Sequence, residues 1–188
     1  VISFFEETQL ISWPSSTYKD GFELNPYLIW EKGFFARYYH SISTPKGFSY
    51  VSSAISDNSI VDSFPDFAWD WLQLSSNEAI INDEKFVVRH AAEVEARTIL
   101  LNCVESLVEP YFACLNANSL MQDDESVRSR LTDAVSIDFL RSNINANWDW
   151  SRLTQRVYKT INLKAMGNAS WIDKWDWDFL SDSLEIDD

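Results

Sequence analysis

Four side chains in this sequence have types suited to acid–base or nucleophilic chemistry: His40, His90, Cys103 and Cys114. His90 stands close to Glu93, which would suit general acid–base catalysis, but a structural histidine with one hydrogen-bond partner is the interpretation we favour for it and for His40. On one straight helix Cys103 would lie about 20 Å from His90, too far to form a catalytic pair. No glycine-rich oxyanion turn flanks either cysteine. We therefore predict no catalytic residues and a protein that is not an enzyme.

Metal-binding and cofactor motifs are also missing from the sequence. Neither HExxH nor CxxC occurs, and the two histidines have no ligand-type spacing. The pair Asp176 and Asp178 begins like an EF-hand loop, but Phe179 and Leu180 follow where calcium ligands should stand. We predict no metal, no cofactor and no small-molecule ligand.

The chain is strongly acidic, with 29 Asp and Glu against 15 Lys and Arg and a formal net charge of −14. Such a surface would be repelled by phosphate backbones, so we expect no direct binding of nucleic acid. The same charge would attract a protein with a basic surface and speed its association. The alternative is that the charge only keeps the protein soluble.

The cysteines and the hydropathy indicate the compartment. If Cys103 and Cys114 share a helix they lie about 16 Å apart, too far for a disulfide. If Pro110 breaks the helix, a bridge is possible, but nothing in the sequence supports one. We therefore expect two buried thiols in a reducing cytoplasm. No signal peptide and no run of 18 apolar residues is present, so we expect no membrane span. The absence of an initiator Met, together with the apolar start at residues 1–5, suggests a segment of a longer protein.

Only four glycines occur, which argues against all-β, Rossmann and P-loop folds. Apolar residues at helical spacing predict instead a long helix from Asp83 to Glu109, ending near Pro110. Asn25 followed by Pro26 resembles a helix start. The polar stretch 116–126 is predicted to be a loop, with helices resuming at 127–135 and 137–141.

A short motif, W-D-W-x-x-L-[ST], recurs three times. Its copies begin at Trp69, Trp148 and Trp175, and a degenerate copy is suggested at residues 48–55. The spacings of 79 and 27 residues favour stacked helical repeats. The invariant residues are Trp69, Asp70, Trp71 and Leu74; Trp148, Asp149, Trp150 and Leu153; and Trp175, Asp176, Trp177 and Leu180.

The chemistry of the motif predicts a helix start. The Asp is expected to be the N-cap, with its carboxylate accepting backbone N–H groups of the first turn. The Trp before it and the Leu four residues after it would then form a hydrophobic staple. The second Trp would point elsewhere and pack against the neighbouring repeat, and the Ser or Thr after the Leu would cap the next turn.

These units resemble the tryptophan-rich W-[DN]-W-x-x-L-S-x-N repeats found in many bacterial proteins of unknown function. The resemblance covers roughly residues 48–90 and 137–185 and implies arrays of short helical hairpins without catalytic residues. Residues 91–136 depart from the pattern. We therefore expect an all-α fold of short helical hairpin repeats, arranged as an irregular solenoid or a helical bundle. It would be one domain over residues 1–188, with an internal joint at 116–126.

The function expected from these features is a non-catalytic protein–protein interaction module, a scaffold or regulator. The resemblance implies a bacterial multiprotein complex in antiviral defence or signalling. One alternative is an inhibitor of a basic partner that is released by cleavage in the 116–126 loop, at Leu120, Met121 and Gln122. Another is an accessory domain of an enzyme whose catalytic part lies elsewhere. Trp13 and Trp30 are the candidates for exposed interaction anchors.

Overall fold

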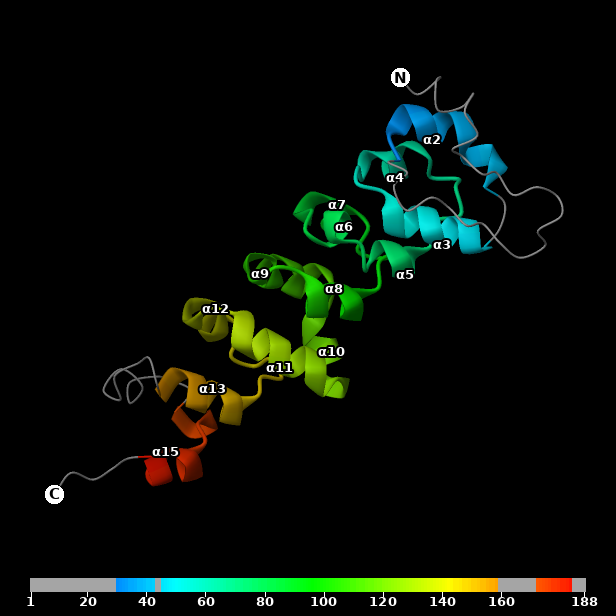
Figure 1. Cartoon of the computed structure of the whole chain (residues 1–188). Helices are drawn as coiled ribbons and strands as arrows, with labels where there is room; N and C mark the ends of the chain where they lie inside the picture. Colours follow the sequence, from blue (N-terminus) through cyan, green and yellow to red (C-terminus); the bar gives the residue numbers. More distant parts are fainter. Residues whose placement is uncertain (1–29, 43–44, 159–171, 184–188) are drawn as a thin grey trace. The chain divides into compact units, whose positions relative to one another are not determined.

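The computed structural model describes residues 30–42, 45–158 and 172–183, and this part of the chain is all-α (Figure 1). Thirteen α-helices and two short 3-10 helices occupy it, most of them only one to three turns long. The only β-type pairing in these residues is an isolated bridge between Trp30 and Ile55. The chain divides into two compact units, Val1–Glu95 and Ala96–Asp188.

Unit 1 is a set of short helices around an aromatic core. In chain order they are α2 (Lys32–Tyr38), η1 (Tyr39–Ser41), α3 (Pro45–Ala54), α4 (Ser59–Ser63), α5 (Trp71–Leu74), α6 (Glu78–Ile81) and α7 (Glu84–Arg89). Helix α2 packs against α4, α3 against α5, and α6 against α7. Helices this short are unstable alone in water, so their apolar faces must be stabilised by burial against one another.

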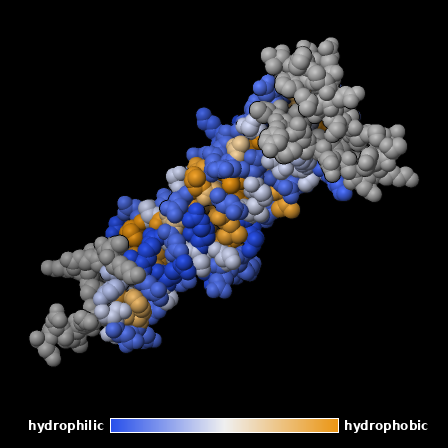
Figure 2. Space-filling view, in the orientation of Figure 1, coloured by the Kyte–Doolittle hydropathy of each residue, from blue (hydrophilic) through white to orange (hydrophobic). Residues whose placement is uncertain are grey.

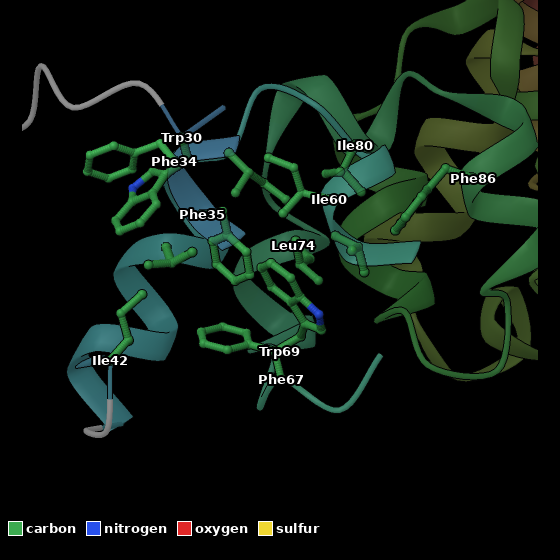
Figure 3. Packing of buried hydrophobic residues seen from close by; sticks show 13 residues of the cluster. Trp30, Phe34, Phe35, Ile42, Ile60, Phe67, Trp69, Leu74, Ile80 and Phe86 are labelled. Atoms are coloured by element: carbon green, nitrogen blue, oxygen red, sulfur yellow. The ribbon is translucent and has the colours of Figure 1, made fainter. Parts of the chain in front are cut away.

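Phe35 lies at the centre of this core (Figure 3). Its ring is fully buried and stacks on Trp69 with a centroid distance of 5.3 Å. Phe67 meets Phe35 edge-on at 5.0 Å, and Trp30 meets it edge-on at 5.9 Å. Aromatic pairs in these geometries add stability beyond the area they bury.

Unit 2 contains longer helices. They are α8 (Ala96–Asn102), α9 (Glu105–Cys114), α10 (Ala117–Asp123), α11 (Glu125–Ala134), α12 (Ile137–Ser142), α13 (Trp150–Tyr158), η2 (Ile172–Lys174) and α15 (Trp177–Ser183). Helix α11 packs against α8, α9, α10 and α13, and α13 packs against α15. Its aromatic contacts repeat a feature of unit 1, because Phe112 stacks on Trp148 at 5.5 Å.

The single long helix predicted from Asp83 to Glu109 is wrong. Three helices occupy this stretch: α7 ends at Arg89, α8 spans Ala96–Asn102 and α9 begins at Glu105. Val104 has extended backbone angles and its side chain is 49% exposed. Pro110, the predicted terminator, lies inside α9. Each short helix buries its own apolar residues. Their spacing along the sequence therefore looked like the apolar face of one long helix.

The loop predicted at 116–126 is also wrong. Asn116 adopts a left-handed conformation with φ of 51°, which Asn tolerates better than most residues, and α10 starts directly after it. Met121 in this helix is fully buried, while Gln122 is exposed. A protease needs an accessible, extended segment, so the structure gives the proposed cleavage at Leu120, Met121 and Gln122 no support.

The remaining predictions about the fold concern the N-terminal residues, the two cysteines and membrane spans. Asn25, Pro26 and Trp13 lie outside the described residues. Cys103 is buried and Cys114 half-buried, and no disulfide joins them. Among the described residues no helix is both long and apolar enough to cross a membrane. On the face shown in Figure 2, hydrophilic residues predominate on the described surface and hydrophobic ones form small separate groups.

Candidate interaction surface and the joints that support it

The three motif aspartates are helix N-caps, as the sequence predicted. The Asp70 carboxylate accepts the backbone N–H of Gln73 at 3.1 Å, Asp149 accepts that of Arg152 at 2.9 Å, and Asp176 accepts that of Phe179 at 3.0 Å. The Phe179 N–H and the Ser151 hydroxyl, which donates at 2.7 Å, hold the pKa of Asp176 below its ordinary value. Each cap fixes where its helix begins and therefore where both tryptophans point.

The first Trp of each motif belongs to the core. Trp69, Trp148 and Trp175 are all at least nine-tenths buried, as are the motif leucines. The indole N–H of Trp69 donates to the carbonyl of Phe64 at 3.0 Å, and that of Trp148 donates to Asn143 at 2.8 Å, five residues back in both cases. This bond closes the turn before the helix and satisfies the polar end of a buried ring.

The second Trp packs against the following segment, as predicted, in the first two motifs. The ring of Trp71 lies 5.2 Å from that of His90 and 6.5 Å from that of Phe86. Trp150 meets Trp175 edge-on at 6.1 Å. Trp177, in the third motif, is 51% exposed.

The prediction that the motif Ser or Thr caps the next turn is wrong. The Ser75 hydroxyl donates to Trp71 O at 2.6 Å in its own helix and accepts the backbone N–H of Glu95 at 2.7 Å. Thr154 does the same, donating to Trp150 O at 2.6 Å and accepting from Asp176 N at 3.0 Å. The hydroxyl therefore connects one helix to the start of a later helix, an arrangement we call a hydroxyl joint.

Four hydroxyl joints occur in the described residues, two in each unit. Besides Ser75 and Thr154, Ser52 accepts the N–H of Asp70 at 2.9 Å and Thr132 accepts that of Asp149 at 3.2 Å. All four hydroxyl-bearing residues have no exposed surface. A buried hydroxyl must be bonded, so each joint requires the next helix to start at one place.

His90, the candidate acid–base residue, has a structural environment. Its Nε2 lies 2.8 Å from Asp62 Oδ1, and its ring packs on Trp71 and Phe86. Arg89 binds the second oxygen of Asp62. Burial would raise the pKa of Asp62, but the bonds from His90 and Arg89 outweigh burial and lower it. These contacts hold α7 on α4, and Glu93 lies 4.0 Å from the other ring nitrogen.

The remaining candidates for chemistry are dispersed. His40 is exposed in η1, where its ring contacts Tyr39. Cys103 is 2% exposed, and burial raises the pKa of its thiol. Within residues 30–42, 45–158 and 172–183, no three His, Cys, Asp or Glu side chains are grouped as metal ligands would be.

Basic side chains of unit 2 bind within the unit itself. Arg152 pairs with Asp133 through two bonds of 2.7 and 2.5 Å, and Arg130 donates to Cys103 O at 3.1 Å. Lys174 donates to Ile144 O at 2.8 Å while its ammonium lies 5.3 Å from the centroid of the Trp150 ring. The other basic residues described in this unit, each with an internal partner, are Arg97, Arg128, Arg141 and Arg156.

Few large apolar side chains reach the described surface: Leu72, Val88, Val104 and Trp177, each about half exposed. Trp30, predicted as an exposed anchor, is 1% exposed and packs edge-on against Phe34 at 5.4 Å. Trp30 is therefore a core residue. Trp177 is the aromatic member of this exposed set. The sequence places Trp177 in the third copy of the W-D-W motif and does not single it out as exposed.

Comparison with known protein families, with curated proteins and with solved structures finds no match for this chain.

Proposed function

We propose that this protein is a non-catalytic protein–protein interaction module whose partner presents a basic surface. The observation that carries the proposal is the unequal use of charge in unit 2. Its described Arg and Lys side chains bind carbonyls and carboxylates of the same unit, while many of its carboxylates point to solvent. Among the residues of this unit that the structure describes, the exposed acidic side chains with no ion-pair partner include Asp123, Glu125, Asp173, Asp178 and Asp182.

The internal use of the basic groups matters because it fixes them. Arg156 of α13 is half-buried and donates to backbone carbonyls at the end of α11, so freeing it would leave buried acceptors unsatisfied. Such a guanidinium cannot turn outward to neutralise the surface. The side chains of Arg97, Arg141 and Arg152 are partly exposed, but each pairs with a carboxylate of the same unit. The exposed carboxylates without such a pair would steer a basic partner toward unit 2.

A scaffold role also fits the way in which the helices are joined. We propose that the chain is built of helical hairpin repeats of the tryptophan-rich bacterial type, arranged as a solenoid or an irregular bundle. The four hydroxyl joints and the three capped W-D-W starts support this proposal, because each repeat then specifies where the next one begins. Arrays of this kind present extended surfaces suited to multiprotein complexes.

The proposal is tested by using the whole chain as bait in a pull-down at low salt and at about 0.5 M salt, where surface attraction is screened within a few ångström. Captured proteins are identified by mass spectrometry, purified and titrated by calorimetry under both conditions. We expect a basic protein that binds at low salt and is lost at high salt. Capture of partners that bind equally at both salts, or of acidic partners, would contradict the proposal.

Matched charge variants locate the effect. The triple change Asp173→Asn, Asp178→Asn and Asp182→Asn removes three exposed carboxylates of unit 2. The control removes Glu78, Glu84 and Glu93 of unit 1 by change to Gln, altering net charge equally. We expect the first variant to weaken binding more than the second. An equal loss would mean that total charge, rather than a surface on unit 2, determines association.

A further inference from the structure

The hydrogen bonds that precede the first two W-D-W motifs occur twice in the chain, with one spacing. The indole N–H of Trp69 donates to Phe64 O at 3.0 Å, and 79 residues later that of Trp148 donates to Asn143 O at 2.8 Å. The backbone N–H of each Trp donates to the carbonyl two residues before it, at 2.8 and 2.9 Å. A Phe ring stacks on each indole, with centroid distances of 5.3 and 5.5 Å. The turn that leads into the motif helix is therefore built in the same way in both places.

The hydroxyl joints that receive these motifs have the same spacing. Ser52 in α3 accepts the N–H of Asp70, and Thr132 in α11 accepts the N–H of Asp149. The two hydroxyl residues are 80 residues apart and the two aspartates 79. Helix α3 packs against α5 as α11 packs against α13, so the joints connect corresponding pairs of helices.

A third contact is repeated three residues after the motif Leu. There the Asn77 side chain binds carbonyls at the end of α3, and 79 residues later the Arg156 side chain binds carbonyls at the end of α11. Both sets include the carbonyl of the joint residue itself, Ser52 in the first case and Thr132 in the second. An amide and a guanidinium share only their N–H donors, so the position repeats its role and not its residue type.

The joint that follows each motif reveals a helix start that the residue types do not mark. Thr154 accepts the N–H of Asp176, the cap residue of the third motif. At the position 79 residues before Thr154, Ser75 accepts the N–H of Glu95. Helix α8 begins directly after Glu95, just as α15 begins directly after Asp176. Glu95 therefore stands where the third motif has its capping Asp.

The apolar residues around Glu95 match those of the third motif. The residues directly before the two cap positions, Val94 and Trp175, are both buried. The residues four positions after them, Ile99 and Leu180, are buried as well. In the motif these are the places of the first Trp and of the Leu, so this stretch repeats the burial pattern of a W-D-W motif with smaller side chains.

We propose that residues 52–95 and 132–176 are two copies of one helical module, in which Glu95 is the helix-start residue that corresponds to Asp176. One matching bond would be a coincidence, but an indole bond, two hydroxyl joints and a carbonyl clamp at a spacing of 79–81 residues require the same path of the backbone. The inference goes beyond the proposed function, because it states which parts of the scaffold are interchangeable. Repeat proteins are stabilised by contacts within a repeat and with its neighbours, so an equivalent segment should fit in either copy.

The test replaces a segment of the first copy by its equivalent from the second, in the whole chain. Residues 69–76 take the sequence of residues 148–155, which makes the changes Leu72→Ser, Gln73→Arg, Ser75→Thr and Ser76→Gln. The threonine hydroxyl keeps an acceptor for the Glu95 N–H, and its methyl group should fit because Thr154 is fully buried at the equivalent place. We expect the melting temperature to stay within about 2 °C of the wild type.

The matched control is the same graft with Ser75→Val in place of Ser75→Thr. Valine has nearly the shape of threonine but offers no acceptor, so the melting temperature should fall by about 4 °C or more. The amide of Glu95 should also exchange with deuterium faster in this control, as the amide of Asp176 should in Thr154→Val, and NMR measures both rates.

Two outcomes would overturn the inference. If the threonine graft loses as much stability as the valine graft, the motif helices of the two copies are not equivalent. If the Glu95 amide of the wild type exchanges as fast as it does in the valine graft, the joint does not hold Glu95 and the first copy has no helix start there.

Discussion

Arg156 clamps the end of α11 in the way that Asn77 clamps the end of α3. The Asn77 amide donates to the carbonyls of Ser52, Ser53 and Ile55 at 3.2, 3.3 and 2.8 Å. Arg156, which comes 79 residues later, donates to the carbonyls of Thr132, Asp133 and Val135 at 2.5, 2.7 and 2.7 Å. The last carbonyls of a helix have no partner within it, so both side chains satisfy acceptors that would otherwise be buried without a bond.

Arg156→Met should therefore destabilise the protein. Met keeps much of the apolar stem but removes the donors, and hydrogen bonds from a charged group typically contribute about 1.5–3 kcal/mol. We expect a loss of this size in the free energy of unfolding, measured by urea titration followed by circular dichroism.

The matched control for this change is Arg141→Met. Arg141 is exposed and pairs with Asp138 three residues earlier in α12, so its loss should cost less than about 1 kcal/mol. Equal effects of the two variants would show that the carbonyl clamp contributes nothing beyond an ordinary surface ion pair.

Thr154→Val tests the hydroxyl joint. Valine has nearly the shape of threonine, so the change removes the hydroxyl and leaves the backbone N–H of Asp176 without its acceptor. An unsatisfied buried donor costs about 1–3 kcal/mol, and we expect the melting temperature to fall accordingly. Ser181→Ala changes the corresponding motif position in α15, where the side chain is exposed, and should have little effect. If Thr154→Val leaves the melting temperature unchanged, water must replace the hydroxyl as the acceptor for the Asp176 N–H.

Local signals in the sequence were sufficient to predict where the three motif helices start. Asp70, Asp149 and Asp176 act within three residues of themselves, so the cap could be derived from spacing alone. The direction of Trp71 and Trp150 toward the following segment also followed from their place after the cap. These parts of the fold depend on the chemistry of one turn.

Longer-range features could not be derived in this way. The partner of Ser75 is Glu95, 20 residues away, and nothing in the residue type of Glu95 marks it, since its backbone makes the bond. Asn77 and Arg156 both bind carbonyls at the end of a helix, but they do so with different side chains, so the residue types do not reveal the shared role. The helix breaks after Arg89 and after Asn102 interrupt a stretch in which the helical spacing of apolar residues continues, so that spacing does not mark them.

The two cysteines should differ in reactivity. Cys103 is 2% exposed, and burial raises the pKa of its thiol despite the nearby positive charge of Arg130. Alkylation requires an accessible thiolate, so half-buried Cys114 should react with iodoacetamide first. Peptide mass spectrometry over time gives the two rates, and a urea-unfolded sample provides the control in which the rates should converge. Faster labelling of Cys103 in the native protein would contradict the packing of α8 against α11.

Acid should weaken the helix cap that Asp176 provides for α15. The Phe179 N–H and the Ser151 hydroxyl lower its pKa in the folded protein, so folding favours the ionised form. Its contribution to stability is therefore present above the ordinary Asp pKa of about 3.9 and is lost as the pH falls through the lower folded value. Asp176→Asn retains a side chain that can cap a helix but cannot ionise.

We expect the wild type to lose more free energy of unfolding than Asp176→Asn between neutral pH and about pH 3, because only the wild type protonates at this site. Urea titrations at several pH values measure the difference. Asp173→Asn removes an exposed carboxylate three residues away without removing a cap, and it should follow the wild-type curve. If Asp173→Asn flattens the acid dependence as much as Asp176→Asn does, the effect comes from net charge, and the cap at Asp176 does not govern the acid stability of α15.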